Sequence, residues 1–272
     1  MIPRESDLFW DRVRPMRIVT WNVNSIRSRH DRLLAFLKRH EPDVVCLQEL
    51  KTEESKYPRE ALEFAGYTSV VNGQKTYNGV AILSKRPVSD AQMGLDDGVD
   101  DPQARLVSAT VSGVKVVCVY VPNGGEMGSD KWQYKLAWYR RLRAWLERHA
   151  SPSQPLILCG DFNVAPEAID VHDPAAWEGD VLFHPEARAA LANVTGWGLR
   201  DTFREKHVGE AGLYSWWDYR MLGFPKNKGL RIDHLFATAT LADRCQGAFI
   251  DREERKGEAP SDHAPVIADF SE

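Results

Sequence analysis

Eight short runs of apolar and β-branched residues constrain the fold of this chain more than any other feature of its sequence. They lie at residues 17–21, 44–47, 80–83, 106–111, 115–121, 156–159, 232–237 and 266–270. Runs of this kind are typical of strands that are covered on both faces. Apolar residues at helical spacing predict helices at residues 30–39, 131–149 and 185–192. Because strands outnumber helices and do not alternate with them regularly, we expect two packed sheets with helices outside.

Length and composition favour one domain of ordinary globular character. The 272 residues are 43% hydrophobic and 27% charged, which argues against a disordered chain. No apolar run approaches the ~20 residues that cross a bilayer, and the first ten residues have no apolar segment typical of a signal peptide. We therefore expect an extension over residues 1–15, a single domain over residues 16–272, and no membrane partner.

The formal net charge of −4 excludes a basic field over the whole protein, so a nucleic-acid partner would need a local positive surface. Arg27 with Arg29 and the segment 220–231 are candidates, although each alone is typical of a solvated loop. The charge-rich segments 95–103 and 251–258 are also interpreted as solvated loops. None of the four cysteines forms a CxxC pair and three lie in apolar runs. This pattern predicts buried thiols in a cytoplasmic protein.

Polar side chains stand repeatedly at the ends of the predicted strands. Those that follow a strand are Asn22, Glu49, Tyr120, Asn123, Asp161 and Asn163, and those that precede one are Asp233, Asp262 and His263. Each has a plain structural explanation when taken alone, as a solvated carboxylate, a turn residue after Gly160, or a core histidine. Together they offer a set of oxygen ligands suited to Mg²⁺ or Mn²⁺, whereas a zinc site would need more histidine or cysteine.

The same residues fit the hydrolysis of a phosphodiester, which requires an activated water, stabilisation of charge and help for the leaving oxygen. Asp161 can orient and deprotonate water, and Asn163 can donate a hydrogen bond nearby. His263 can hold a non-bridging oxygen if Asp233 fixes its imidazole. Tyr120 can donate to the developing charge. The signatures GxSxG, GxxxxGK[ST], GxGxxG and HExxH do not occur.

Eight motifs occur in order along almost the whole chain from residue 16: TWNVNSIR, CLQELK, YNGVAILSK, VYVPNGGE, CGDFNVAP, YSWWDYR, KGLRIDHLFA and PSDHAPV. This set resembles the exonuclease III family of DNA-repair nucleases, which includes the apurinic/apyrimidinic endonucleases. The resemblance implies a four-layer α/β sandwich of the DNase I-like kind, with two mixed sheets face to face. It also implies a monomer that hydrolyses duplex DNA with Mg²⁺, 5′ to abasic sites or from 3′ ends, in base excision repair.

The resemblance further implies roles for individual residues. The metal site comprises Asn22, Glu49, Asp161, Asn163 and Asp262, with Lys51 beside it. The catalytic residues are Tyr120, Asp161, Asn163, Asp233 and His263. A small pocket for a base-free sugar comprises Trp216, Leu230 and Ile232, while Arg27 and Asn123 contact DNA. Whether one or two metals act, and whether Asp161 or His263 is the base, stays open; we favour Asp161.

Two alternatives remain. The GDFN and SDH motifs are shared by relatives that act on inositol polyphosphates or other small phosphoesters, so the same fold could serve such a substrate. The stretch YSWWDYR…KGLRIDH favours DNA instead. A non-catalytic DNA-binding protein on a degraded nuclease scaffold is the second alternative. It would normally have lost a ligand or the base, and this chain retains all of them. The sequence leaves open the balance between abasic-site and 3′-end cleavage.

Overall fold

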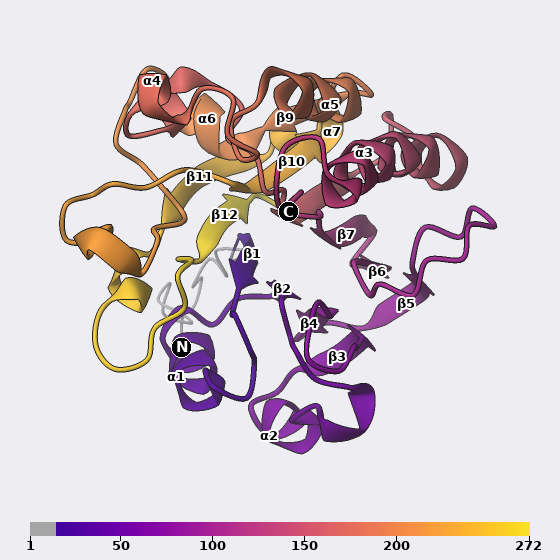
Figure 1. Ribbon diagram of the computed structural model, residues 1–272. Helices are drawn as coiled ribbons and strands as arrows, with labels where there is room; N and C mark the ends of the chain where they lie inside the picture. Colours follow the sequence, from indigo (N-terminus) through magenta and orange to yellow (C-terminus); the bar gives the residue numbers. More distant parts are fainter. Residues whose placement is uncertain (1–14) are drawn as a thin grey trace, which may run out of the picture.

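The computed structural model describes residues 15–272, whose strands form two six-stranded sheets packed face to face (Figure 1). The first sheet has the order β11-β12-β1-β2-β4-β3. Its strands are β1 (Met16–Asn22), β2 (Val44–Gln48), β3 (Thr68–Asn72), β4 (Val80–Ser84), β11 (Cys245–Ile250) and β12 (Val266–Phe270). The expected extension over residues 1–15 lies outside the described residues, apart from Pro15.

The second sheet has the order β5-β6-β7-β8-β10-β9. Its strands are β5 (Val88–Met93), β6 (Leu106–Val111), β7 (Val114–Tyr120), β8 (Leu156–Asp161), β9 (Leu199–Asp201) and β10 (Asp233–Thr238). Each sheet contains one parallel pair, β1 with β2 and β7 with β8, among antiparallel neighbours. Both sheets are therefore mixed, as the family resemblance implied.

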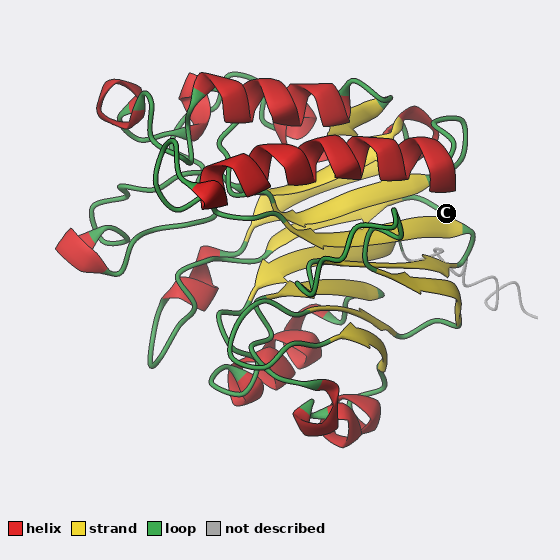
Figure 2. Ribbon diagram, turned by 45° about the vertical axis from the view of Figure 1, so that its right-hand side comes forward, coloured by secondary structure: helices red, strands yellow, loops and turns green. Residues whose placement is uncertain are grey.

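Helices cover the outer face of each sheet (Figure 2). Leu33, Phe36 and Leu37 of α1 (His30–His40) and Leu62 of α2 (Arg59–Phe64) pack on the first sheet. The long helix α3 (Asp130–His149) and α5 (Pro185–Thr195) pack on the second. Shorter helices are α4 (Pro174–Trp177), α6 (Thr202–Lys206) and α7 (Ala239–Ala242). This arrangement confirms the four-layer α/β sandwich. No helix among the described residues is long and apolar enough to cross a membrane.

The apolar side chains between the two sheets form the central core. Cys46 of β2, Cys118 of β7 and Cys159 of β8 lie in it, fully buried among valine, isoleucine and leucine side chains. All four cysteines fall within the described residues, and they are buried and unpaired. The expectation of buried thiols is confirmed, because the alternation of side chains across each strand points these cysteines into the space between the sheets.

The eight predicted strands and three predicted helices are all present, and the strands that sequence patterns missed are the four sheet edges. These are β3 and β11 in the first sheet and β5 and β9 in the second. Their side chains are mostly half-buried or exposed. An edge strand is covered less completely, so it does not need the continuous apolar run that identifies a central strand.

Gly160 lies inside β8, directly opposite Val119 of the parallel neighbour β7. The plain structural explanation of Asp161 placed a bend at Gly160, whereas both residues belong to the strand. Its backbone φ is +150°, and a Cβ atom there would lie 1.9 Å from the Val119 carbonyl oxygen. Glycine is required because it lets the backbones of β7 and β8 approach closely just before Asp161.

Replacing Gly160 by alanine should destabilise the protein by about 3 kcal/mol or more, because rigid backbone occupies the space of the added methyl group. Gly113→Ala is the matched control: Gly113 has a φ of +78° with open space around it, so its variant should lose only about 1 kcal/mol to backbone strain. Urea unfolding of both variants measures the difference. Equal stabilities would contradict this account.

Candidate active site

Strand ends from both sheets meet at one edge of the sandwich. Asn22 ends β1, Glu49 follows β2, Tyr120 ends β7 and Asp161 ends β8. The fully buried Asn22 amide donates from Nδ2 to Glu49 Oε1 and to Asp161 Oδ2, both at 2.9 Å. This one amide links carboxylates from the two sheets.

Glu49 binds two further polar groups. The Tyr120 hydroxyl donates to Glu49 Oε1 at 2.9 Å, and the Lys51 ammonium lies 2.8 Å from Glu49 Oε2. Glu49 and Lys51 both have positive φ, +52° and +51°, which turns the chain so that both side chains face the cluster. Burial, then the charges of Glu49 and Asp161, raise the pKa of Tyr120 well above its usual value. Tyr120 therefore stays a neutral donor.

Asp161, His263 and Asp233 form a buried chain of charges. His263 Nδ1 lies 2.9 Å from Asp233 Oδ2, and His263 Nε2 lies 3.8 Å from Asp161 Oδ2. The Ser215 hydroxyl donates to Asp233 Oδ2 at 2.6 Å. Asp233 stands opposite Asp161 in the antiparallel pairing of β10 with β8. The expected pairing of Asp233 with His263, 30 residues apart, is present.

The surroundings of Asp161 and His263 change both pKa values. Burial, and then the negative charge of Asp233, raise the pKa of Asp161 to about 7, although the nearby His263 opposes this. For His263, burial alone would lower the pKa. The charges of Asp233 and Asp161 outweigh it and raise the pKa to about 10. At neutral pH and without a metal, His263 is therefore an imidazolium that Asp233 holds in place.

Asn163 is fixed in the loop after β8 by its own amide groups. Its backbone N–H donates to Asp161 Oδ1 and its side-chain Nδ2 donates to the Val121 carbonyl, both at 2.9 Å. Its Oδ1 accepts a hydrogen bond from Asn123 Nδ2 at 3.0 Å. Asn163 has a φ of +50°, which asparagine tolerates better than most residues. The pair of asparagines thus orients Asp161 through the loop that follows β8.

The donor set at the centre of this cluster suits a divalent cation. Ligand atoms of Glu49, Asp161 and His263 all lie within 4.8 Å of one another. Two carboxylates among these three residues match the preference of Mg²⁺ or Mn²⁺ for oxygen ligands. Asn22 turns its amide nitrogen toward the carboxylates, and its Oδ1 accepts from the Asn24 backbone. It therefore bridges the two possible ligands.

Asp262, which the sequence also assigned to the metal, has hydrogen-bonding partners of its own. Asn24 Nδ2 donates to its Oδ1 at 2.8 Å, and Trp216 Nε1 donates to its Oδ2 at 3.0 Å. Burial would raise its pKa, but the charge of His263 and these two hydrogen bonds lower it. Asp262 thus interacts with the cluster through the charge of the adjacent residue, His263.

The three residues expected to form an apolar sugar pocket pack together. The backbones of Trp216 and Leu230 are bonded to each other, and the Trp216 ring lies against the core that contains Leu230 and Ile232. Leu230 and Ile232 are fully buried, whereas Trp216 is half-buried and meets the Trp177 ring edge to face at 6.2 Å. Of these three residues, only Trp216 has apolar surface that a bound sugar could contact.

The remaining expected contact residues lie at the rim. Arg27 is exposed and lines a hollow of about 860 Å³ with Arg32, Arg39 and Lys56, so it is not part of the carboxylate cluster. Asn123 is exposed in the loop after β7, where its amide reaches Asn163. The role of both residues in binding DNA stays a prediction.

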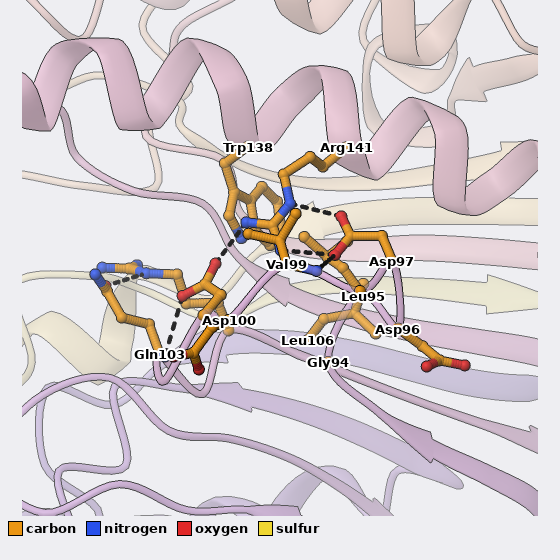
Figure 3. Close-up of a pocket in the computed structure, with 13 residues that line it drawn as sticks. Gly94, Leu95, Asp96, Asp97, Val99, Asp100, Gln103, Leu106, Trp138 and Arg141 are labelled. Atoms are coloured by element: carbon orange, nitrogen blue, oxygen red, sulfur yellow. Dashed lines mark hydrogen bonds and ion pairs between the residues drawn. The ribbon is translucent and has the colours of Figure 1, made fainter.

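The acidic loop after β5 is mostly exposed, as expected, and it is also anchored to a helix. Arg141 of α3 lies 2.6 Å from both Asp97 and Asp101 at a hollow of about 400 Å³ (Figure 3). The same hollow is lined by Arg105, whose guanidinium lies 4.7 Å from the Tyr120 ring centroid and donates to the Tyr120 carbonyl. Arg105, which follows this loop, therefore contacts Tyr120 from outside the cluster. Segment 251–258 is not simply solvated either, because it buries Glu254 and Arg255.

Sequence reasoning missed several supporting residues, among them Ser215, Asn24, Arg105 and Lys135. Lys135 of α3 is fully buried and donates to carbonyls of three loops. The helical spacing could have indicated that Lys135 is buried, because it lies one turn from Trp132 and Tyr139 on the inward face of the helix. Arg105 had no such signal.

Comparisons with known proteins agree with this geometry. A model of the endonuclease/exonuclease/phosphatase family matches residues 19–263. Exodeoxyribonuclease III of Haemophilus influenzae is 34% identical over 266 residues, which cover 94% of this chain and all of that protein. The chain belongs to the endonuclease/exonuclease/phosphatase family. Within this family it falls with the exonuclease III relatives, as the motifs indicated.

Solved structures of family members superpose closely. An AP endonuclease from Archaeoglobus fulgidus is 41% identical with a TM-score of 0.91, covering 94% of this chain and 99% of that one. A variant of the 3′ phosphatase NExo from Neisseria, bound to a product DNA hairpin, is 40% identical with a TM-score of 0.91, covering 94% and 100%. These likenesses confirm the fold of the family over the described chain.

Replacing Asp233 by asparagine should lower the pKa of His263 by about two or more from its value near 10, because the charge that most favours the imidazolium is lost. An NMR titration of the metal-free protein measures this pKa. Glu60→Gln, an exposed charge on α2, is the control that should leave it unchanged. A His263 pKa equally high in the asparagine variant would refute the role of Asp233.

Proposed function

We propose that this family member is a Mg²⁺- or Mn²⁺-dependent nuclease of DNA repair. It hydrolyses phosphodiesters of duplex DNA, 5′ to abasic sites, from 3′ ends, or both. The single observation that carries the proposal is the convergence of Glu49, Asp161 and His263, whose ligand atoms lie within 4.8 Å of one another. The names of relatives support the substrate, since they include an exodeoxyribonuclease III, an AP endonuclease and a 3′ phosphatase bound to DNA.

Glu49 and Asp161 would hold the cation, with Asn22 keeping the two carboxylates together. A divalent ion bound there would neutralise charge on the phosphate and on the leaving oxygen. Mg²⁺ keeps several water ligands and binds through one or two carboxylates. The oxygen-rich donor set therefore favours it over zinc.

Asp161 orients and deprotonates the attacking water. In the metal-free site, burial raises the pKa of its carboxyl group to about 7, which makes it a stronger base than a solvated carboxylate. The backbone N–H of Asn163 and the amide of Asn22 each bind one of its two oxygens, so the carboxylate has a fixed direction. The water oxygen forms a bond to phosphorus while the bond from phosphorus to the 3′ oxygen breaks. Asp161 takes the proton of the water and the 3′ oxygen takes up a proton from solvent, which leaves a 3′-hydroxyl and a 5′-phosphate.

His263 and Tyr120 stabilise the charge that develops on the phosphate. The imidazolium of His263 can donate from Nε2 to a non-bridging oxygen, because Nδ1 is already bonded to Asp233. The neutral Tyr120 hydroxyl donates its one proton to Glu49 at 2.9 Å, so it would become a second donor to the phosphate once a cation takes over the Glu49 oxygen. Neither side chain has to gain or lose a proton to play this part.

The protein's partner would be duplex DNA that carries an abasic site or a 3′ end, bound by a monomer. Trp216 contributes apolar surface beside Asp262 and His263, where a sugar without a base would fit better than a complete nucleotide. Arg27 is a candidate phosphate contact. The unpaired buried thiols support a reducing compartment, which we propose is the cytoplasm.

A labelled duplex with one abasic site tests the substrate. In Mg²⁺, nicking 5′ to the site is expected, and EDTA should abolish it because the carboxylate cluster would lose its cation. An intact duplex with a recessed 3′ end measures exonuclease activity in parallel. Phosphate release from inositol polyphosphates, with both DNA substrates untouched, would contradict the proposal.

Asp161→Asn and His263→Ala should each lower the rate of nicking by about 10³-fold or more, because each removes a group that acts on the reacting atoms. Glu60→Gln, on the outer surface, should keep the full rate. Circular dichroism checks that both variants remain folded. Full activity in either folded variant would refute the role given to that residue.

A further inference from the structure

Lys135 is a buried amine outside the carboxylate cluster. Burial lowers its pKa to about 7, but the three carbonyl acceptors around Nζ favour the protonated form. Lys135 lies on the inner face of α3 and is fully buried. Its Nζ donates to the carbonyl oxygens of Asn123, Asn163 and Val181 at 3.0, 2.7 and 2.6 Å. An ammonium group has three protons, so every proton of Lys135 is used on a different loop.

Two of these three loops carry residues of the site. Asn123 stands in the loop after β7, Asn163 in the loop after β8, and Val181 between α4 and α5. The ammonium therefore ties the two loops whose side chains bond to each other through Asn123 Nδ2 and Asn163 Oδ1. Lys135 reaches both loops from α3, in the outer helix layer.

The peptide groups of Asn163 show how this tie reaches the reacting carboxylate. The Asn163 N–H binds Asp161 Oδ1 at 2.9 Å, and the Asn163 carbonyl binds Lys135 at 2.7 Å. Between these two bonds the backbone adopts a φ of +50°, which is costly for a residue with a side chain. The hydrogen bond from Lys135 helps to hold this conformation, and the conformation aims the N–H at Asp161.

The neighbouring loop is shaped around the lysine stem. Gly124 has a φ of +97°, and a Cβ atom there would lie 2.9 Å from Lys135 Cδ and 3.1 Å from the Trp132 ring. An apolar side chain of the same length would fill this space without the expense of burying a charge. Packing alone therefore does not account for a lysine at this position.

We propose that Lys135 is a positioning residue for the nuclease reaction: it clamps the Asn123 and Asn163 loops so that Asp161 keeps its productive direction. The proposal rests on the proposed function for the reaction it serves. Lys135 lies beneath the loops and touches no reacting atom, so its effect passes through Asn163. A displacement of about 1 Å in such a group costs roughly 100-fold in rate.

The test compares Lys135→Met and Lys135→Gln in the full chain, with Mg²⁺ and the abasic duplex. Methionine keeps most of the volume but donates no hydrogen bond, whereas glutamine keeps two donors. We expect kcat to fall about 100-fold for methionine and less for glutamine, with KM changed less than about two-fold. A loss graded by the number of donors distinguishes positioning from packing.

Leu142→Ala is the matched control, because Leu142 is a fully buried residue of the same helix that contacts the apolar core. It should lower Tm and leave kcat unchanged at temperatures where the protein is folded. If Lys135→Met keeps kcat within about three-fold of wild type, raises KM alone, or loses no more kcat than Leu142→Ala, the proposal is overturned.

Hydrogen exchange of the Asn163 amide gives a second readout that needs no turnover. We expect exchange about ten-fold faster or more in Lys135→Met than in wild type, and unchanged exchange in folded Leu142→Ala. Unchanged exchange in Lys135→Met overturns the proposal. A wild-type protein that does not cut DNA would refute the proposed function, while this measurement would still decide whether Lys135 holds the loop.

Discussion

The hydrogen bonds of the Asn22 amide join the two sheets at the point where chemistry is expected. One nitrogen binds Glu49 from the first sheet and Asp161 from the second, each at 2.9 Å. Two carboxylates brought this close repel each other in a site with little water. The amide dipole and the His263 imidazolium offset that repulsion until a cation does so. Every other feature of the cluster depends on this meeting of the two sheets.

The environment gives chemically similar groups different tasks. Asp161 is desolvated and lies near another carboxylate, so its pKa rises toward neutrality. Asp262 accepts hydrogen bonds from Asn24 and Trp216 and lies near the imidazolium, so its pKa falls. Separated pKa values of this kind identify which carboxylate can exchange a proton at neutral pH and which stays ionised. The burial of Asp161 therefore supports its proposed role as the base.

Sequence patterns identified the central strands and the polar residues at their ends, and for the same reason. A strand covered on both faces must be continuously apolar, so the first polar residue after it marks the sheet edge, as at Asn22 and Asp161. This pattern does not identify edge strands. In β5, for example, five of the six residues are exposed. The pattern also does not predict which charged residues form ion pairs. Nothing local in the sequence indicates that Arg141 would meet Asp97 and Asp101, which lie 44 and 40 residues away.

The segment that leads into β10 shows why such hidden charges matter for function. Arg231 is buried between Asp170 at 2.7 Å and Asp201 at 2.8 Å. Its N–H groups also reach His234, whose pKa is lowered to about 4 by burial and by this guanidinium, so that a neutral ring accepts the bond. Buried ion pairs add little net stability compared with apolar packing, but their bonds are directional and costly to break. Because Arg231 stands two residues before Asp233, this network fixes where β10 begins and therefore where His263 finds its partner.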